Sequence, residues 1–528
     1  MTYTIEKVTT LIGARRYGDN DTNIGFILTD SRSLCFPEET LFFALKSERN
    51  DGHNYIPELY RRGVKNFVVT DVPKGYASDY PEANFLKVVN TLEALQRLAE
   101  RHRDEFNIPI VGITGSNGKT MVKEWLYQLL SPSMFVTRSP RSYNSQIGVP
   151  LSVWLMNEQT QVGVFEAGIS QPGEMLALRD IIQPTIAVLT NVGSAHQENF
   201  SSLEEKCREK LILFHDAETV VYDGDDEVIT KVVAEYPDYK GEKLFWSLKN
   251  PEAPFYVRKI EKQQSVSVIT YIYKGVEDSF SIPFIDDASI QNSIICAAVA
   301  SKIGLSAEDI DKRMALLEPV AMRLEVKVGQ HGCTLINDSY NSDINSLDIA
   351  LDFMNRRPDH RGRRHTLILS DIYQSGQTPE ALYKEVSDLA RKRGVVKFIG
   401  IGPELCKQHD TIQISEKFFF PNVEEFINSE VFASLRDEVI LLKGARQFGF
   451  DQLTELLVQK VHETTLEVNL NAVVANLNYY RAFMKPEIKL VCMIKADGYG
   501  AGAVEIAKTL QDHRVDYLAV AVADEGVT

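Results

Sequence analysis

The chain has 528 residues, of which 44% are hydrophobic and 25% are charged, and its formal net charge is −16 at pH 7. These proportions are typical of a globular protein and exclude a disordered or fibrous chain; at roughly 150 residues per domain, the length favours three or four domains. The acidic balance excludes a general affinity for nucleic acid or anionic lipid, since an acidic surface repels both.

Cysteine spacing and hydropathy indicate where the protein works. Six cysteines are scattered without C-x-x-C spacing, which is typical of a reducing compartment and favours neither disulfides nor a zinc site. The first residues lack the apolar core of a signal peptide, and no apolar run approaches the roughly 18 residues of a membrane span. A basic cluster at residues 356–364 favours a solvated connector over a nucleic-acid patch. We therefore expect a cytoplasmic protein with no membrane span and no nucleic-acid partner.

The first domain is predicted at residues 1–107. Short apolar strands (40–45, 66–70 and 85–89) alternate there with a helix that ends near Phe106, and Pro109 follows. From Ile110 onwards, short apolar strands alternate with helices, and these strands fall at 109–114, 162–168, 185–191 and 219–225. That alternation predicts a mostly parallel, doubly wound α/β domain over residues 108–317.

A second change of pattern follows the helix predicted at residues 289–303, where a charged stretch leads to Pro319. A third α/β domain is predicted at residues 318–463, with strands near 333–336, 366–369, 396–401 and 439–442. The pattern then restarts, so residues 464–528 are expected to form a separate segment.

The segment GITGSNGKT (112–120) has the composition of a phosphate-binding loop between a strand and a helix. Glycines let backbone N–H groups point at phosphate, Lys119 neutralises the outer phosphates, and the Thr120 hydroxyl suits magnesium. Ile113 stands where the usual pattern has glycine, so the loop is atypical. The following MVKEWLYQLL reads as a helix, which is the context the motif needs. We predict nucleotide binding by residues 115–120.

Two polar residues are expected at the same edge of the sheet as this loop. Glu166 ends the strand VGVFE, and open α/β sheets place their ligands at the carboxyl ends of strands. A carboxylate there can hold magnesium. His196 follows the strand TIAVLTN in the same way. A lone histidine is more often structural than a ligand, and the residues alone leave both interpretations of His196 open.

Lys210 is a lysine on an apolar helix face. If 203–214 is helical, Leu203, Cys207, Lys210 and Phe214 fall in a stripe about 60° wide at 100° per residue. Desolvation would favour the neutral amine, which carbon dioxide converts into an anionic carbamate ligand. A lysine whose stem packs and whose head reaches water is the simpler reading, and the residues alone favour it.

Together these motifs resemble the Mur ligase family, which builds the peptide of bacterial peptidoglycan. The resemblance spans about residues 20–460. TDSRS (29–33) and LFFALKSERNDGHNYI (41–56) are similar to the part of the family that binds a uridine nucleotide. The central motifs are TGSNGKTMVKE (114–124), YNSQIGVP (143–150), FEAGISQPGEM (165–175) and NVGSAHQENF (191–200). The later ones are MRLE (322–325), INDSYNSDINS (336–346), LSDIYQSG (369–376) and LKGARQFGFDQL (442–453). The implied fold is a three-domain α/β Mur ligase with a central phosphate-loop ATPase domain.

The resemblance also implies residue roles. It implies magnesium ligands at Thr120, Glu166, His196 and Lys210 (the last as a carbamate), and catalytic roles for Lys119, Lys210 and His196. It implies ATP contacts from Gly115, Ser116, Asn117, Gly118, Lys119, Thr120, Asn292, Arg323, Asp338 and Asn341. It implies substrate contacts from Ser31, Arg32 and His53 to the uridine nucleotide and from Asn144 and Ser145 to the sugar or peptide. Met121 and the pair Ala288-Ser289 depart from the family pattern, which puts adenine or substrate contacts in doubt but removes no magnesium ligand.

Lys123-Glu124 and Tyr340-Asn341 favour the final ligase of the family, because the preceding ligase is expected to read Tyr-Ala-His at the second position. That ligase joins D-alanyl-D-alanine to UDP-N-acetylmuramoyl-tripeptide with ATP and Mg²⁺, through an acyl phosphate, and releases ADP and phosphate. The resemblance implies these small-molecule partners and a monomeric ligase part.

Three alternatives remain: a Mur ligase of the preceding step, a folylpolyglutamate-type ligase, and a nucleotide-binding scaffold without catalysis. The motifs of the first domain weigh against the folate reading. The presence of Lys119, Glu166, His196 and Lys210 weighs against the scaffold.

Residues 464–528 resemble the start of alanine racemase, through TTLEVNLNAVVANLNYY, LVCMIKADGYGAG and VDYLAVAVADEGV. Lys495 matches the lysine that forms a Schiff base with pyridoxal phosphate in the intact racemase, and Tyr499 matches a nearby family position. Ala501 stands where the family usually has histidine. The segment is expected to form the beginning of a (β/α)8 barrel, which in full needs about 250 residues. We expect it not to racemise alone, and an intact racemase part to be dimeric. An unrelated appendage is the alternative.

Overall fold

The computed structural model describes residues 1–34, 36–47, 50–140, 142–193, 199–236, 239–320, 324–339, 343–356, 362–373, 377–459, 468–481, 483–485 and 488–527. The chain divides into two compact units, one made of residues 1–98 with 461–528 and the other of residues 99–460. Within the described ranges, no helix combines the length and the apolar character needed to cross a bilayer.

The N-terminal part of the first unit contains a five-stranded sheet. Strands β4 (Phe26–Leu28), β5 (Thr40–Phe43), β6 (Asn66–Val69) and β7 (Asn84–Lys87) pair in parallel, and β2 (Arg15–Tyr17) pairs antiparallel to β7. The short strands β1 (Tyr3–Thr4) and β3 (Asn23–Ile24) pair separately. The helices are α1 (Ile5–Ile12), α2 (Ile56–Arg61), α3 (Tyr76–Asp79) and α4 (Thr91–Arg103). Stacked rings of Phe67 and Phe85, 5.3 Å apart, lie in the core beneath this sheet.

The C-terminal residues of the first unit form two parallel strands joined through a helix. Strand β23 (Val491–Met493) pairs with β24 (Tyr517–Ala519), and α20 (Ala503–Asp512) lies between them in the chain. Helices α18 (Leu470–Arg481) and α21 (Ala523–Val527) flank them. The turn labelled α19 (Lys495–Gly500) has positive φ from Ala496 to Tyr499, so it winds left-handed. A strand, helix and parallel strand form the repeating unit of a β/α barrel.

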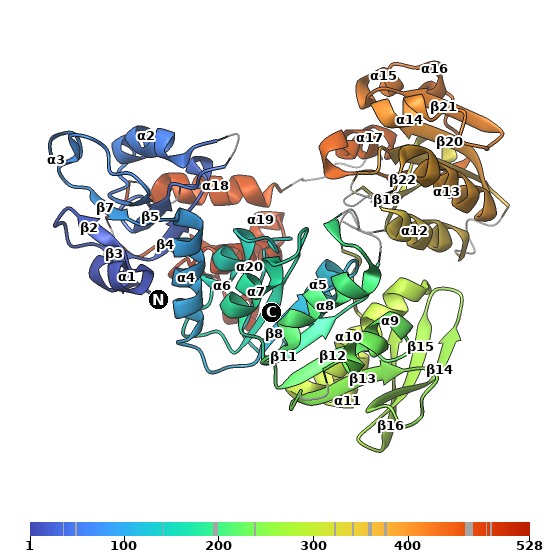
Figure 1. The fold of residues 1–528 in the computed structure, drawn as a ribbon, viewed down its shortest axis with the longest axis horizontal. Helices are drawn as coiled ribbons and strands as arrows, with labels where there is room; N and C mark the ends of the chain where they lie inside the picture. Colours follow the sequence, from blue (N-terminus) through green and yellow to red (C-terminus); the bar gives the residue numbers. More distant parts are fainter. Residues whose placement is uncertain are drawn as a thin grey trace. The chain divides into compact units, whose positions relative to one another are not determined.

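The second unit is built first on a nine-stranded sheet (Figure 1). Its seven parallel strands are, in spatial order, β14 (Phe255–Lys262), β13 (Glu242–Ser247), β12 (Thr219–Asp223), β11 (Ile186–Leu189), β8 (Ile110–Thr114), β10 (Val162–Glu166) and β9 (Val136–Arg138). The chain leaves β8, adds β9 and β10 on one side, and then returns to add β11 on the other. This reversal of strand order leaves a crevice at the carboxyl end of β8, where doubly wound sheets bind ligands.

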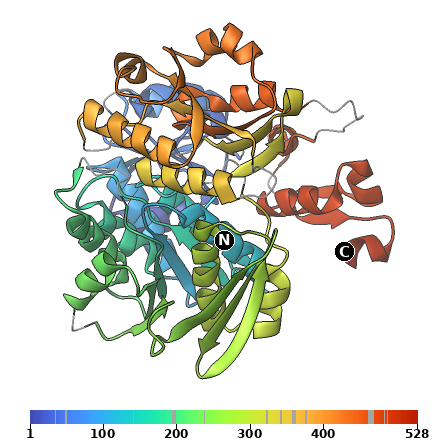
Figure 2. The ribbon, with the colours of Figure 1, turned by 90° about the vertical axis from the view of Figure 1, so that its right-hand side faces the viewer.

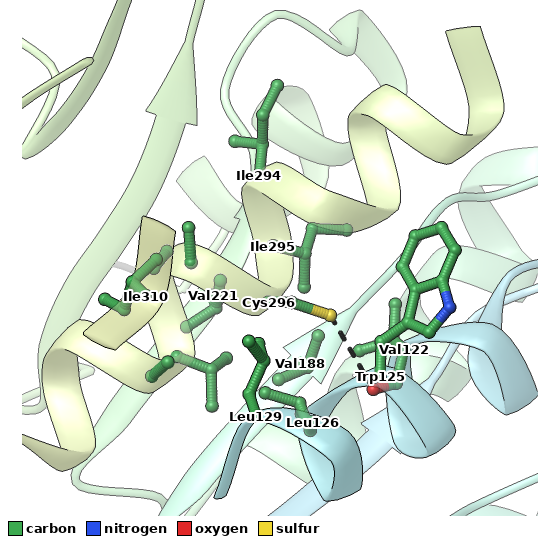
Figure 3. Close-up of a cluster of buried hydrophobic side chains, with 14 of the residues drawn as sticks. Val122, Trp125, Leu126, Leu129, Val188, Val221, Ile294, Ile295, Cys296 and Ile310 are labelled. Carbon is green, nitrogen blue, oxygen red and sulfur yellow. Dashed lines mark hydrogen bonds between the residues drawn. The ribbon is translucent and has the colours of Figure 1, made fainter. Parts of the chain in front are cut away.

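Helices cover both faces of this sheet. Helices α5 (Lys119–Leu130), α10 (Asp287–Ile303) and α11 (Ala307–Met314) supply one apolar core. Helices α6 (Gly148–Val153), α7 (Glu174–Ile182), α8 (Leu203–Leu211) and α9 (Glu227–Ala234) supply the other. In the first core, the thiol of Cys296 on α10 points at the carbonyl oxygen of Val122 on α5, 3.7 Å away (Figure 3). That core fixes α5, and with it the loop that precedes it.

The sheet continues as an antiparallel extension that the sequence analysis does not assign. Strands β14, β15 (Ser267–Tyr273) and β16 (Val276–Ile282) form this yellow-green ribbon at the lower edge of Figure 2. Helix α11 packs on β16. The backbone N–H of Ser281 in β16 donates to the carboxylate of Asp311 in α11, 3.1 Å away.

The last sheet of the second unit has six strands. Strands β18 (Thr334–Asp338), β22 (Glu438–Lys443), β19 (Arg364–Ser370), β20 (Val395–Ile401) and β21 (Glu416–Phe420) are parallel, and β17 (Glu325–Val328) pairs antiparallel to β18. Its helices are α12 (Ile344–Arg356), α13 (Pro379–Lys392), α14 (Pro403–Lys407), α15 (Val423–Ile427), α16 (Glu430–Ala433) and α17 (Phe450–Leu457). Two members of the basic cluster have protein partners: Arg363 donates to the hydroxyl of Thr334, and Arg364 pairs with Glu416. Arg357 and Arg361 lie outside the described residues.

Candidate active site

The phosphate loop joins β8 to α5, as its motif predicts, and two of its glycines are required by its shape. Gly115 has φ +144° and Gly118 has φ +84°, a region that L side chains rarely adopt. A Cβ atom on Gly115 would lie 1.9 Å from the hydroxyl oxygen of Thr190, and one on Gly118 would lie 2.6 Å from Oδ1 of Asn292. The loop therefore packs directly against the end of β11 and the first turns of α10.

Hydrogen bonds from the segment after β11 hold the loop in place. The hydroxyl of Thr190 donates to the carbonyl of Asn117 (2.5 Å), and the Asn117 N–H donates to Oδ1 of Asn191 (2.9 Å). The Ser116 N–H donates to the Asn191 carbonyl (3.0 Å), and the Gly193 N–H donates to the Ser116 hydroxyl (2.8 Å). These bonds preorganise the loop backbone, which lowers the entropic cost of wrapping a phosphate chain.

Lys119 is the first residue of α5, and its ammonium group folds over the loop. Nζ donates to the carbonyls of Gly115 (2.7 Å) and Ser116 (3.2 Å). A cavity of about 600 Å³ lies beside it and is lined by residues 115–121, Lys210 and Asn292, among others. That volume is in the range of small-molecule sites, and a positive charge at a helix N-terminus suits the phosphates of a nucleotide.

Glu166 ends β10 inside the same site, and its carboxylate is fully buried. Oε2 accepts from the hydroxyl of Thr120 (3.2 Å) and from the amide of Asn144 (3.2 Å), while Oε1 lies 3.2 Å from Nζ of Lys123. A hydroxyl and a carboxylate oxygen side by side are the donors that Mg²⁺ prefers, so these residues fit a magnesium ion. Asn144 therefore lies at the carboxylate of the predicted metal site.

Lys210 lies on the buried face of α8, as the helical stripe predicts, and is 2% exposed. Its Nζ donates to the carbonyl of Gly115, 3.2 Å away. Burial, reinforced by the charges of Lys119 and Lys206, holds the pKa of Lys210 well below its ordinary value. The neutral amine is the form that carbon dioxide modifies, and a snorkelling lysine would reach water instead. Lys210 is therefore not a snorkelling lysine, and its modification by carbon dioxide stays a prediction.

Asn292 and Asp338 both line the cavity. Asn292 is 8% exposed and reaches Gly118 from α10. Asp338 ends β18, and its Oδ2 lies 2.6 Å from Nζ of Lys443 at the end of β22. The Ser145 hydroxyl accepts the N–H of Gly148, the first residue of α6. His196, Arg323 and Asn341, which the resemblance brought to the same site, lie outside the described residues.

The candidate nucleotide-binding residues of the N-terminal sheet lie in the first unit. Ser31 and Arg32 form a short 3-10 turn, and the exposed guanidinium of Arg32 pairs with Asp30 at 2.6 Å. His53 is engaged at both ring nitrogens: Nδ1 contacts Asp51 (2.7 Å), and Nε2 accepts the N–H of Thr70 (3.1 Å). Since Nε2 accepts, Nδ1 carries the proton. The ring of His53 thus ties two loops together, while Arg32 presents its charge to solvent.

Two protein-family models match this chain. The Mur ligase middle domain model matches residues 113–300, and the alanine racemase N-terminal domain model matches residues 468–528. The UDP-N-acetylmuramoyl-tripeptide–D-alanyl-D-alanine ligase of Bacillus subtilis is 28% identical over 371 residues, which cover 69% of this chain and 77% of the relative. The protein of the same name from Borreliella burgdorferi is 26% identical and covers 82% of this chain and 93% of the relative.

Solved structures agree on the fold. A crystal structure of MurF from Acinetobacter baumannii superposes with a TM-score of 0.74 at 21% identity over 86% of this chain and 99% of that one. A MurF ligase from Thermotoga maritima in complex with ADP gives a TM-score of 0.69 at 22% identity over 81% of this chain and 96% of that one. The chain belongs to the Mur ligase family. The expected α/β Mur ligase fold, followed by the start of a racemase domain, is confirmed.

Two buried lysines belong to this site although the sequence analysis gave neither a role in it. Lys123 on α5 is fully buried against Glu166, and Lys206 on α8 is 2% exposed and donates to the carbonyl of Gly193 (2.5 Å). Desolvation lowers the pKa of Lys206 to about 8. Lys206 lies four residues before Lys210, one helical turn away, and this spacing was the available signal. For Lys123, the signal was a charged residue among the apolar positions of α5.

Proposed function

We propose that this chain joins D-alanyl-D-alanine to UDP-N-acetylmuramoyl-tripeptide, using ATP and releasing ADP and phosphate. The observation that carries the ATP half is the phosphate loop at residues 115–120, which contacts Glu166 through the Thr120 hydroxyl and Lys210 through the Gly115 carbonyl. The substrate half is supported by the relatives in B. subtilis and B. burgdorferi, which bear the name of that ligase. Residues 1–107, with Ser31 and Arg32, bind the uridine nucleotide; residues 108–317 bind ATP; and residues 318–463 complete the ligase.

Magnesium belongs to this proposal. Thr120 and Glu166 hold the ion through oxygen atoms, together with His196 and with Lys210 as its carbamate. When bound, the ion neutralises charge on the phosphates as it moves between oxygens. The neutral Lys210 amine forms the carbamate with carbon dioxide, and the new group bears the negative charge that a cation ligand needs.

The chemistry has two steps. An oxygen of the terminal carboxylate of the tripeptide attacks the γ-phosphorus of ATP, the bond to the β-phosphate oxygen breaks, and an acyl phosphate and ADP form. The free amine of D-alanyl-D-alanine then attacks the acyl carbon, phosphate leaves with the bonding electrons, and the amine proton passes to solvent. The first step brings two anions together, and the Lys119 ammonium lowers that barrier because it lies over the loop that holds the phosphates.

The racemase segment completes the proposal. Lys495 directly follows Ile494 at the carboxyl end of β23, and its Nζ lies 5.9 Å from the ring of Tyr499. Catalytic residues of β/α barrels lie at this end of the strands. In a complete racemase domain, Lys495 would hold pyridoxal phosphate and Tyr499 would lie beside it. Racemisation of alanine yields the D-alanine from which the dipeptide of the ligase reaction is made.

One assay tests the ligase function. Purified protein is mixed with ATP, Mg²⁺, the UDP-linked tripeptide and D-alanyl-D-alanine, and ADP release is followed in a coupled assay. We expect release that requires the dipeptide and that falls at least a hundredfold in Lys119→Ala, because one phosphate-stabilising charge is worth about 3 kcal/mol or more of the barrier.

Two controls make this assay decisive. Replacing the dipeptide by the diamino acid of the preceding step tests the neighbouring Mur reaction, and adding glutamate with a folate tests the folylpolyglutamate alternative. Turnover with either in place of the dipeptide would overturn the assignment. A well-folded protein without dipeptide-dependent turnover would do so as well.

A further inference from the structure

Lys123 is a fully buried lysine on α5, one turn after the phosphate loop. Its neighbours Val122, Trp125 and Leu126 pack into the apolar core, yet Lys123 itself is also 0% exposed. A buried ammonium is costly unless it is paired and hydrogen-bonded. Its position therefore calls for partners inside the protein, and the structure supplies them.

Three groups surround its Nζ. Oε1 of Glu166 lies 3.2 Å away, Oε1 of Glu124 lies 2.9 Å away, and the carbonyl oxygen of Ser139 accepts a hydrogen bond of 2.9 Å. On the far side of Glu124, Nε of Arg138 lies 3.1 Å from Oε2. Charges thus alternate from Arg138 through Glu124 and Lys123 to Glu166, and the row ends at the metal site.

The two carboxylate oxygens of Glu166 contact different groups. Oε1 faces Lys123, while Oε2 faces the hydroxyl of Thr120 and the amide of Asn144. The Glu166 backbone N–H donates to the hydroxyl of Ser139, so the residue is also held at its main chain. A carboxylate fixed in this way presents one oxygen in a set direction, and groups behind a metal ligand govern metal affinity by this means.

We propose that Lys123 is a positioning residue, which holds Oε1 of Glu166 and thereby aims Oε2 at the metal that accompanies the nucleotide. This inference rests on the metal site of the proposed function. It gives a role to the Lys123-Glu124 pair, which the sequence analysis used only to choose between ligases. If Lys123 has this role, replacing it should reduce the gain in nucleotide affinity that Mg²⁺ provides. The affinity of the loop for the nucleotide without Mg²⁺ should stay unchanged.

Calorimetric titration of ADP, once with Mg²⁺ and once with EDTA, measures that coupling without relying on turnover. In Lys123→Met we expect the Mg²⁺-dependent gain in ADP affinity to fall about tenfold or more, which is the usual effect of removing a group behind a metal ligand. The affinity in EDTA should stay within about twofold of wild type. Lys302→Met is the matched control, since Lys302 pairs with Glu242 at the surface of the same sheet domain, and it should change neither value.

A double-mutant comparison guards against misfolding. Lys123→Met alone leaves the Glu166 charge buried without its partner, whereas Lys123→Met/Glu166→Gln removes both charges. The double variant should fold, as judged by its circular dichroism melt. It should show the same Mg²⁺-dependent gain as Glu166→Gln alone, because without the carboxylate Lys123 has nothing to aim.

The outcomes separate the inference from the proposed function. If wild-type protein gains no ADP affinity from Mg²⁺, the metal site itself is wrong. If wild type gains affinity and Lys123→Met gains as much, the inference alone is wrong. An equal loss with and without Mg²⁺ would also overturn it, because it would show that Lys123 merely supports α5.

Discussion

Replacing Gly115 by alanine tests whether the end of β11 shapes the phosphate loop. The added methyl carbon would lie 1.9 Å from the hydroxyl oxygen of Thr190 and 3.1 Å from its Cβ, so the Thr190 side chain must rotate. Rotation breaks the hydrogen bond that Thr190 donates to the carbonyl of Asn117. The loop would then lose both its backbone conformation at residue 115 and one of its anchors.

The magnitude follows from these contacts. Holding a non-glycine residue at positive φ costs about 1–2 kcal/mol, and a lost hydrogen bond costs about 1 kcal/mol. Crowding in a packed region adds about 1 kcal/mol or more. We therefore expect Gly115→Ala to weaken ADP binding by about 3 kcal/mol, which is on the order of a hundredfold in the dissociation constant.

Calorimetry measures this loss, and a second substitution tests its cause. Thr190→Ala alone should weaken binding only about fivefold, since it removes one hydrogen bond and creates no clash. In Gly115→Ala/Thr190→Ala the clash with the hydroxyl is gone, so affinity should recover by the crowding term, about fivefold, from the single Gly115 variant. Tight binding by Gly115→Ala would refute the reasoning, and so would a double variant no better than the single one.

Three further predictions concern buried charge. Lys210→Ala should lose activity and regain part of it in molar formate or acetate, because a small carboxylate replaces the carbamate; a variant as active as wild type would contradict the proposed ligand. Lys397→Met leaves Glu438 buried without its lysine, so urea unfolding should show a loss of about 3–5 kcal/mol, and Lys397→Met/Glu438→Leu should recover most of it. Burial raises the pKa of Asp223 to about 6, so the folded state loses stability as the pH rises from 4 through 6. Asp223→Asn should remove that pH dependence and add about 2 kcal/mol to the free energy of unfolding at pH 7. Thermal melts in which the variant differs from wild type by the same amount at pH 5 and at pH 7 would contradict this.

The phosphate loop was predictable because its evidence is local. The strand Ile110–Thr114, the glycines and the helix from Lys119 are adjacent in sequence, and the structure places each where the motif requires. Glu166 was predictable for a related reason, since a residue that ends a parallel strand must lie at the ligand edge of the sheet. Lys210 needed only the helical period, which put it on the buried face of α8.

The groups that hold these residues in place were not predictable. The anchors of the loop, Thr190 and Asn191, directly follow strand β11, which lies more than 70 residues later in the chain and pairs with β8 only in the folded sheet. The role proposed for Lys123, on helix α5, depends on its contact with Glu166, which ends strand β10. The antiparallel strands from Phe255 to Ile282 were missed because a hairpin extension departs from the alternation of strand and helix that dominates the domain.

The antiparallel strands β14 to β16 also affect whether two copies of this protein can pair edge to edge. A sheet that ends in a free strand offers unpaired N–H and C=O groups to any other extended chain. Strand β16 presents fewer such groups, because α11 packs on the strand and Asp311 accepts the N–H of Ser281. Asp278 adds negative charge to the same strand, so a second copy brought edge to edge would meet like charge. The ribbon that widens the nine-stranded sheet thus also protects this edge of it from pairing with another chain.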